Sequence, residues 1–357
     1  MSAKFNPYAA YDSFADQFGA KILASIEKSE APWQKPWAAG APTSGMPRNG
    51  LTGNTYRGSN LVWLSMMRGL YGFSSNEWLT YKQAQEMGGQ VRKGEKQVAQ
   101  VVFWSQVGPR KADQEGKDAT GDDQDKRGPS RLVPRFYGVF NRDQIDGLPA
   151  PRVIEMPGEQ WRHEKADAII AASGARISHD GMGRAFYRPA TDSIHLPEKE
   201  AFHSLDGYLA TVLHELGHWT GHQSRLNRDL TGSFGSESYA REELRAEIAS
   251  WMAGERLGIG HDPTQHAAYA KHWAQIVRQD PKEILRACAD AEAICRHLGI
   301  EPYEQVLAQK SEQERSQGQA QAQQRPVEAV AQLGQAPEQP VAEEAPQERR
   351  RSYGRSR

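Results

Sequence analysis

His214-Glu215-Leu216-Gly217-His218 is the stretch that decides the fold of the region around it. Apolar residues recur near it at helical spacing, at Leu205, Leu209, Val212, Leu213 and Leu216. Residues four apart on a helix share a face, so the two imidazoles can hold one metal ion. The Glu after the first His can then take a proton from a water molecule at that ion, which is the chemistry of a metal-dependent peptidase.

A second helix, expected over residues 239–252, offers the third protein ligand that a catalytic zinc site needs. Glu243 and Glu247 are one turn apart on it and face the same way. We predict Glu243 as the ligand and Glu247 as the acceptor that orients a ligating His, with the reverse assignment left open. His222 competes as a ligand, but in the longer signature HExxHxxGxxH the last His would fall on Ser224. The predicted metal is Zn²⁺, and Mn²⁺ or Co²⁺ also suit these ligands.

The segment before the motif predicts a small mixed domain. An amphipathic helix is expected over residues 159–172, and short extended runs follow at 175–177, 185–187 and 193–196. A zincin-like metallopeptidase domain has this order of elements: a helix, a small sheet, the HExxH helix and a Glu-bearing helix. We place this domain at residues 158–305. The edge strand of such a sheet can pair with an extended peptide.

The preceding region, residues 10–148, predicts an α+β domain that opens with a helix over 12–27. Without its insertion at 108–130, residues 1–148 hold 14 Lys plus Arg against 9 Asp plus Glu, and five of the nine Trp. Cations interleaved with aromatic rings suit single-stranded nucleic acid, although a small aromatic core with surface cations explains them equally well. The candidate DNA contacts are Trp33, Lys35, Trp37, Tyr56, Arg57, Arg92, Lys93 and Lys96.

Composition excludes several classes of protein. A net charge of −1 argues against a wholly basic nucleic-acid binder, and two Cys, at 288 and 295, indicate buried thiols in a reducing compartment. No apolar run is long enough to span a membrane and no signal core is visible, so we expect a cytoplasmic protein. Residues 108–130 and 308–357 are polar and predicted to be disordered, and 146–157 is predicted to be a linker.

Long ordered motifs in both regions resemble the ArdC-type antirestriction proteins of conjugative plasmids. The resemblance covers about residues 10–305, and its motifs are residues 32–37, 52–60, 78–84, 88–96, 139–144, 214–222, 225–228 and 239–247. It implies a single-stranded-DNA-binding domain, which is also similar to a module of TraC-type plasmid primases, joined to a zincin-like metallopeptidase domain. It further implies protection of incoming DNA from host restriction.

The predicted function is that of a DNA-binding metallopeptidase. DNA would localise the chain. The metal would be held by His214, His218 and Glu243. Glu215 would act as general base on an unidentified protein substrate. The alternative is a non-catalytic protein that coats single strands and has a structural metal site. A nuclease or primase helper is disfavoured, because the chain lacks the clustered Asp residues of a two-metal site.

Overall fold

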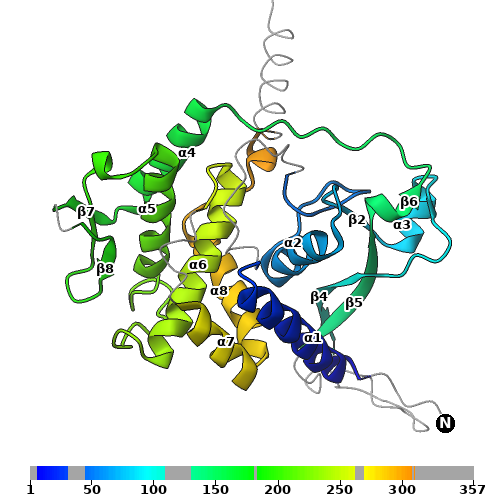
Figure 1. Cartoon of the computed structure of the whole chain (residues 1–357), viewed down its shortest axis with the longest axis horizontal. Coiled ribbons are helices and arrows are strands. Elements are labelled where there is room, and N and C mark those ends of the chain that lie inside the picture. The colour runs from blue at the N-terminus through cyan, green and yellow to red at the C-terminus, as the bar shows by residue number, and fades with distance from the viewer. Residues whose placement is uncertain are drawn as a thin grey trace, which may run out of the picture. The chain divides into compact units, whose positions relative to one another are not determined.

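The computed structural model describes residues 6–30, 45–108, 130–180, 183–261, 269–307 and 309. It has the expected mixed α+β character (Figure 1). The helices are α1 (Pro7–Glu27), α2 (Gly58–Tyr71), α3 (Tyr81–Glu86), α4 (Glu159–Ser173), α5 (Leu205–Trp219), α6 (Glu237–Leu257), α7 (Ala270–Gln279) and α8 (Lys282–His297), with 3-10 turns η2 (Arg142–Gln144) and η3 (Lys199–Ala201). The strands are β1 (Arg48–Asn49), β2 (Glu77–Leu79), β3 (Gln90–Val91), β4 (Ala99–Val107), β5 (Arg131–Asn141), β6 (Ile145–Asp146), β7 (Arg176–His179), β8 (Phe186–Arg188) and β9 (Ser193–Leu196).

Three small sheets organise the described strands. The largest has the order β1-β2-β5-β4, in which β4 and β5 form a long antiparallel hairpin, and β3 pairs with β6 separately. The third has the order β7-β9-β8, with β9 parallel to β7 and antiparallel to β8. This order leaves β8 at an edge of its sheet, next to α5.

Helix ends follow local capping chemistry more than hydrophobic periodicity. The first helix begins at Pro7 and not at the expected residue 12, because the Asn6 side chain accepts hydrogen bonds from the next turn and proline is well suited to the first helical position. The helix that was expected over 239–252 extends from Glu237 to Leu257. Ser236 caps its start, and Gly258 ends it in the left-handed region at φ 72°.

The N-terminal and C-terminal halves of the described chain pack on each other. Helix α1 lies against α7 and α8, and α2 lies against α8. A Cβ atom on Gly19 of α1 would come within 2.9 Å of the Pro281 side chain, so these helices meet at very short range. Residues up to Leu307 form one compact unit. The regions before and after residues 148–158 therefore share one core, while this segment itself is mostly exposed.

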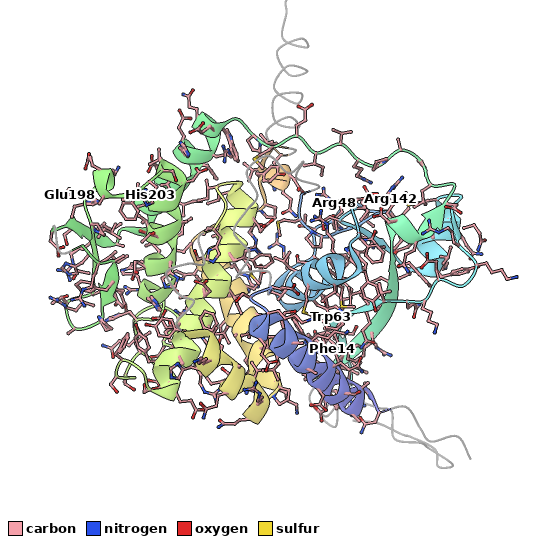
Figure 2. All side chains as sticks on the ribbon, in the orientation of Figure 1. Phe14, Arg48, Trp63, Arg142, Glu198 and His203 are labelled. Atoms are coloured by element: carbon pink, nitrogen blue, oxygen red, sulfur yellow. The ribbon has the colours of Figure 1, made fainter. Side chains whose placement is uncertain are left out.

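Aromatic side chains fill the core beneath the large sheet. Phe14 of α1 packs edge-on against Trp63 of α2, with ring centroids 5.5 Å apart, and both side chains are buried (Figure 2). Arg48 and Arg142, labelled in the same figure, pair with Glu304 and Glu77 at 2.9 and 2.6 Å. Buried Arg48 thus joins the start of the sheet to the segment that follows α8.

Several sequence predictions concern segments outside or between the helices and strands, and others concern the thiols and membrane spans. The insertion at 108–130 and the tail at 308–357 lie, apart from residues 108, 130 and 309, outside the described residues. The expected linker, 146–157, has no helix or strand after Asp146. Cys288 and Cys295 are buried free thiols on α8, as predicted. None of the helices in the described ranges has the length and apolar character needed to cross a bilayer.

Candidate metal centre

Helix α5 places both histidines of the motif in the interior. Ser204 caps the helix by accepting a hydrogen bond from the Gly207 N–H at 3.1 Å. The apolar face of α5 is buried. His214 is 3% exposed and its Nε2 atom lies 3.2 Å from Nε2 of His218. Ligands bound to one tetrahedral zinc ion at about 2.0–2.1 Å lie roughly 3.3 Å apart. The two imidazoles therefore have the separation that a shared ion requires.

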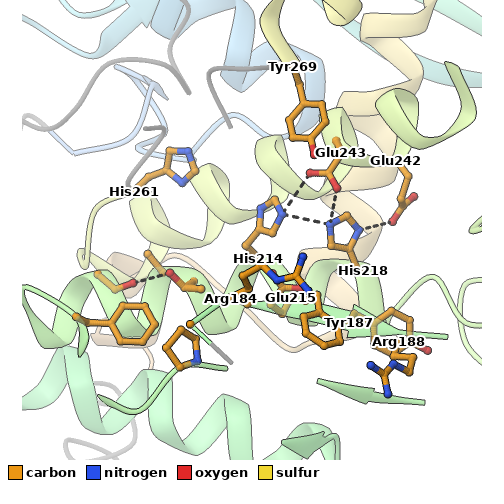
Figure 3. A pocket seen from close by; sticks show the side chains of 18 of the residues that line it. Arg184, Tyr187, Arg188, His214, Glu215, His218, Glu242, Glu243, His261 and Tyr269 are labelled. Atoms are coloured by element: carbon orange, nitrogen blue, oxygen red, sulfur yellow. Dashed lines mark hydrogen bonds and ion pairs between the residues drawn. The ribbon is translucent and has the colours of Figure 1, made fainter. Parts of the chain in front are cut away.

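Helix α6 brings a carboxylate to the same point. Glu243 lies with Oε2 3.7 Å from Nε2 of His214 and Oε1 3.5 Å from Nε2 of His218 (Figure 3). One ligand atom from each of these three residues lies within 4.8 Å of the other two. The structure thus brings together the three residues that the sequence assigns to the metal. Two imidazoles and one carboxylate are donors that suit a divalent transition metal.

A close helix crossing makes this convergence possible. A Cβ atom at Gly217 of α5 would lie 3.5 Å from Ala246 of α6, at ordinary contact distance. Small residues on both helices allow the backbones to approach. The crossing lies within one helical turn of both His218 and Glu243, so side chains of ordinary length reach one point.

Glu247 lies behind the ligands. Its Oε2 atom is 3.6 Å from Nδ1 of His214, and its Oε1 atom is 3.0 Å from Nε2 of His261. Nδ1 of His261 lies 3.3 Å from the hydroxyl of Ser250, which also donates to the Ala210 carbonyl. This position suits the orienting role predicted for Glu247. His261 was not predicted from the sequence, because it lies beyond the end of the Glu-bearing helix.

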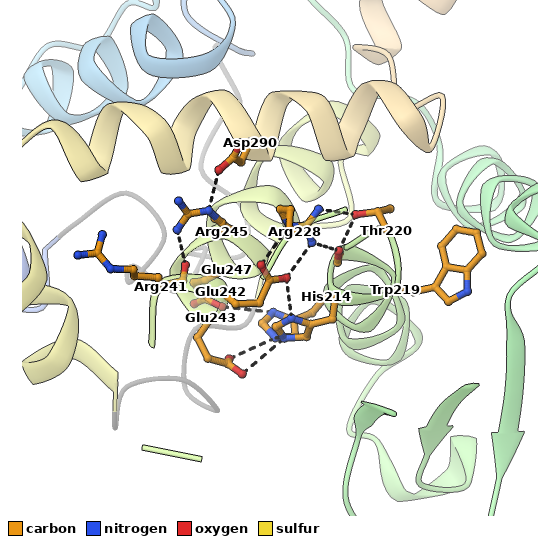
Figure 4. Close-up of polar contacts among 12 residues, drawn as sticks. His214, Trp219, Thr220, Arg228, Arg241, Glu242, Glu243, Arg245, Glu247 and Asp290 are labelled. Atoms are coloured by element: carbon orange, nitrogen blue, oxygen red, sulfur yellow. Dashed lines mark hydrogen bonds and ion pairs between the residues drawn. The ribbon is translucent and has the colours of Figure 1, made fainter. Parts of the chain in front are cut away.

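A second carboxylate orients the other ligand. The Oε1 atom of Glu242 lies 3.2 Å from Nδ1 of His218. The Arg228 guanidinium donates hydrogen bonds to both Glu242 oxygens, at 3.0 and 2.7 Å (Figure 4). Arg228 also donates to the Thr220 hydroxyl and to the Gly217 carbonyl. No role was predicted for Glu242 from the sequence, and its side chain is buried. The Arg228 side chain that stabilises it comes from a loop between the two helices.

The charges of the site favour a cation. Burial lowers the pKa of His218, but Glu243 and Glu242 outweigh it and raise that pKa to about 9. Burial also raises the pKa of Glu243, but His218 and His214 together hold it below its usual range. The pKa of Glu242 is lowered in the same way by His218 and Arg228, against the effect of burial. Carboxylates therefore stay ionised around the two imidazoles, and positive charge is needed between them.

A large cavity opens over these ligands. Its volume is about 1180 Å³, and its lining includes both histidines, Glu215 and residues of strand β8. In β8, Phe186 lies near the guanidinium groups of Arg184 and Arg188, at 6.0 and 5.3 Å from the ring centre. On the other side, Tyr239 and Tyr269 contribute hydroxyls 3.4 Å apart. The cavity is large enough for several residues of an extended peptide.

Two other histidines, His222 and His195, lie outside the ligand group. His222 hydrogen-bonds through Nδ1 to the hydroxyl of Ser224 at 2.8 Å, and it is absent from the three-residue cluster. His195 of β9 lies 2.6 Å from Asp180 and stacks on Phe186. These contacts give His195 a structural role within the small sheet.

The predicted DNA contacts divide into three groups. Trp33, Lys35 and Trp37 lie outside the described residues. Tyr56 is only 6% exposed, and Arg57 pairs with Glu301 at 2.6 Å, so both have structural contacts. Arg92, Lys93 and Lys96 are exposed around the turn after β3, where Arg92 pairs with Glu95 and Asp146.

Metal binding is expected to strengthen as pH rises. At neutral pH His218 carries a proton, because its pKa is about 9, and a metal ion must displace that proton. From about pH 6.5 to about pH 8.5 we expect the affinity for Zn²⁺ to rise about tenfold per pH unit, with about one proton released per ion. Calorimetric titration in two buffers of different ionisation enthalpy measures this number. An affinity that is independent of pH, with no proton released, would contradict the expectation.

Comparison with known proteins connects both halves of the chain to one family. Residues 12–140 match the model of the N-terminal domain of anti-restriction factor ArdC, and residues 164–290 match that of a zincin-like metallopeptidase. The crystal structure of the antirestriction ArdC protein from plasmid R388, in its metal-free form, is 36% identical, covers 80% of this chain and 96% of its own, and superposes with a TM-score of 0.64. Its Mn(II)-bound form is 37% identical with the same coverage and a TM-score of 0.62.

A longer curated relative covers most of this chain. The DNA primase TraC of Escherichia coli is 47% identical over 313 residues, which are 84% of this chain. The chain spans only 28% of that primase. The similarity therefore covers a module that also occurs in a much larger protein.

Proposed function

The chain belongs to the ArdC family of antirestriction proteins, and from this premise we propose that it binds single-stranded DNA and acts on a protein as a zinc-dependent metallopeptidase. Residues 10–148 would bind the DNA and residues 158–305 would carry the metal centre. Together they would protect incoming DNA from host restriction. The observation that carries the peptidase half is the convergence of His214, His218 and Glu243 at the wall of the large cavity.

Glu215 is the proposed general base. It follows the first ligand on α5, is 5% exposed and lines the same cavity. A divalent metal held by the two histidines and Glu243 would lower the pKa of a water molecule and polarise the peptide carbonyl. Glu215 would accept the proton of the attacking water and then donate it to the departing amine. The low exposure of this carboxylate keeps bulk water from competing for that proton.

The openness of the site favours catalysis over a purely structural metal. Structural zinc sites are closed by four protein ligands, whereas catalytic ones keep one position for water or substrate. In the described part of this chain the ligand cluster has three residues and faces the cavity. Glu242 and Glu247 contact the imidazoles at their Nδ1 atoms, which leaves the Nε2 atoms to the ion. These features support an exchangeable position on the ion.

For the peptide substrate we propose an extended conformation along β8. This strand is one of the two edges of its sheet, lies against α5 and lines the cavity together with the metal ligands. An edge strand has free backbone N–H and C=O groups that can pair with a peptide. We propose that the substrate is a protein encountered on DNA, where the N-terminal half would hold the chain.

Single-strand binding is tested with the full chain, because its two halves share a core. Labelled single-stranded and double-stranded DNA of the same sequence are titrated with protein and resolved by gel shift. We expect the single strand to be retarded at protein concentrations at least about tenfold lower, and its affinity to fall steeply between about 50 and 200 mM salt, since phosphate contacts release counterions. Failure to retard the single strand at low salt would remove the DNA-binding half of the proposal.

A further inference from the structure

On one side of the β4–β5 hairpin, exposed side chains lie beside the buried Val101, Val133 and Val139. In its antiparallel register Phe103 is opposite Arg135, and Val101 is opposite Tyr137. Residues opposite each other share a face, and side chains alternate along each strand. Phe103, Tyr137, Arg135 and Arg131 therefore project to the same side. We call these four residues the hairpin face.

The opposite side of the hairpin contacts α1, with Trp104 there still 48% exposed. There the Trp104 ring lies 5.1 Å from Tyr11, and the Phe136 ring lies 5.9 Å from Phe14. This packing fixes which side of the hairpin is turned away from the helix. The hairpin face is thus built on a rigid support and not on a mobile loop.

Two aromatic rings of the hairpin face are half exposed. Phe103 and Tyr137 are each 48% exposed, and their ring centroids are 6.0 Å apart. Tyr56, which is buried, lies behind Phe103 with a centroid distance of 6.4 Å. Large rings placed side by side on neighbouring strands, with part of their surface in water, are the kind of platform on which unpaired bases stack.

The cations of the hairpin face are available. Arg131 and Arg135 are exposed, and neither forms an ion pair with any residue in the described ranges. Strands β4 and β5 contain no Asp or Glu at all. Arg57 and Arg92, by contrast, are already paired with carboxylates. The free positive charge of this sheet therefore lies beside the two exposed rings.

The edge of β4 is occupied at Val102 by a side chain. The Asn60 side chain donates to the Val102 carbonyl at 2.8 Å and accepts from the Val102 N–H at 2.9 Å. These bonds occupy the backbone groups that an added peptide strand would need at that position. Beside Val102, a ligand of this hairpin therefore lies across its face, where it meets rings and guanidinium groups.

We propose that the hairpin face is the surface on which single-stranded DNA binds. Bases stack on Phe103 and Tyr137, and phosphates pair with Arg131 and Arg135. Duplex DNA is disfavoured, because its bases are already stacked on one another and do not offer their faces to the rings. This inference rests on the proposed single-strand binding and names the side chains that perform it.

The test measures fluorescence anisotropy of a labelled oligodeoxythymidine with the full chain. Phe103→Ala with Tyr137→Ala is expected to weaken binding at least about twentyfold, because each stacked ring contributes about fivefold or more. Phe103→Leu with Tyr137→Leu keeps the apolar bulk and removes the flat ring, and it is expected to lose a similar factor. Arg131→Gln with Arg135→Gln is expected to lower the slope of log affinity against log salt by about 1.4, at about 0.7 for each phosphate contact on a single strand.

A matched control uses an exposed ring and an exposed arginine elsewhere. Tyr81 is 43% exposed on α3 and Arg296 is exposed on α8, so Tyr81→Ala with Arg296→Gln should bind like the unmodified chain. The inference is overturned if the folded ring variants bind the oligodeoxythymidine with an affinity within twofold of that of the unmodified chain. It is also overturned if these variants lose binding to a polyglutamate peptide but keep their binding to DNA. If the unmodified chain itself fails to bind, the proposed function fails instead, and the two failures are distinct.

Discussion

Replacing Glu215 by Gln is expected to lower the rate of peptide hydrolysis by about 10²–10⁴-fold, the range that a positioned general base contributes. The amide of Gln has nearly the shape of the carboxylate but cannot accept the proton of the attacking water. Because Glu215 is not among the three clustered ligands, metal content should stay near one ion per chain. Hydrolysis of a mixed peptide library by the zinc-loaded full chain, followed by mass spectrometry, measures the loss.

The controls separate catalysis from binding. Glu200→Gln changes an exposed carboxylate in the turn before α5 and should leave hydrolysis unchanged. Binding of Glu215→Gln to single-stranded DNA should equal that of the unmodified chain. If this variant still protects unmodified DNA during transfer into a restricting host, proteolysis is not the protective act and strand coating is. Unreduced hydrolysis by a metal-loaded Glu215→Gln protein would falsify the assigned role.

Replacing Glu243 by Gln is expected to weaken metal binding more than any other single change on α6. It removes the negative oxygen ligand that lies 3.5 Å from one imidazole and 3.7 Å from the other. Glu247→Gln and Glu242→Gln change only groups that contact the Nδ1 atoms, and loss of such outer contacts costs about 10- to 100-fold in affinity. Competition for Zn²⁺ with a chelator of known affinity ranks the three variants.

Glu237→Gln provides the control on the same helix. Its side chain is 57% exposed and pairs with Arg241, away from the imidazoles, so metal affinity should not change. If Glu247→Gln loses the metal and Glu243→Gln retains it, the reverse assignment that the sequence left open is correct. Equal and small effects of all three substitutions would leave the site without a carboxylate ligand, which would contradict the proposed centre.

The two helices of the metal centre could be predicted because their signals are local. The apolar spacing around His214 and His218 predicts a helix, and that helix in turn implies a shared ion. The strand Ser193–Leu196 was also predicted with its observed bounds. Helix ends were less accurate, since Asn6 and Ser236 act through single hydrogen bonds that periodicity does not reveal.

The contacts that support the ligands could not be predicted in the same way. Glu242 meets Arg228, and Glu247 meets His261, through side chains separated by 14 residues in each case. Nothing in the local pattern distinguishes a solvated Glu on a charged helix from one that is buried behind an imidazole. The same holds for the hairpin face, because the exposure of Phe103 and Tyr137 depends on where α1 packs.

The sequence alone determined that the two imidazoles share one helix face, because residues four apart lie one turn apart on the same side of a helix. The tertiary structure alone decided which carboxylates meet them. Helix α6 crosses α5 where Gly217 meets Ala246, and this crossing turns Glu243 toward the Nε2 atoms while Glu242 and Glu247 lie at the Nδ1 atoms. That choice depends on the distance and angle between two packed helices, and these are set by the whole core.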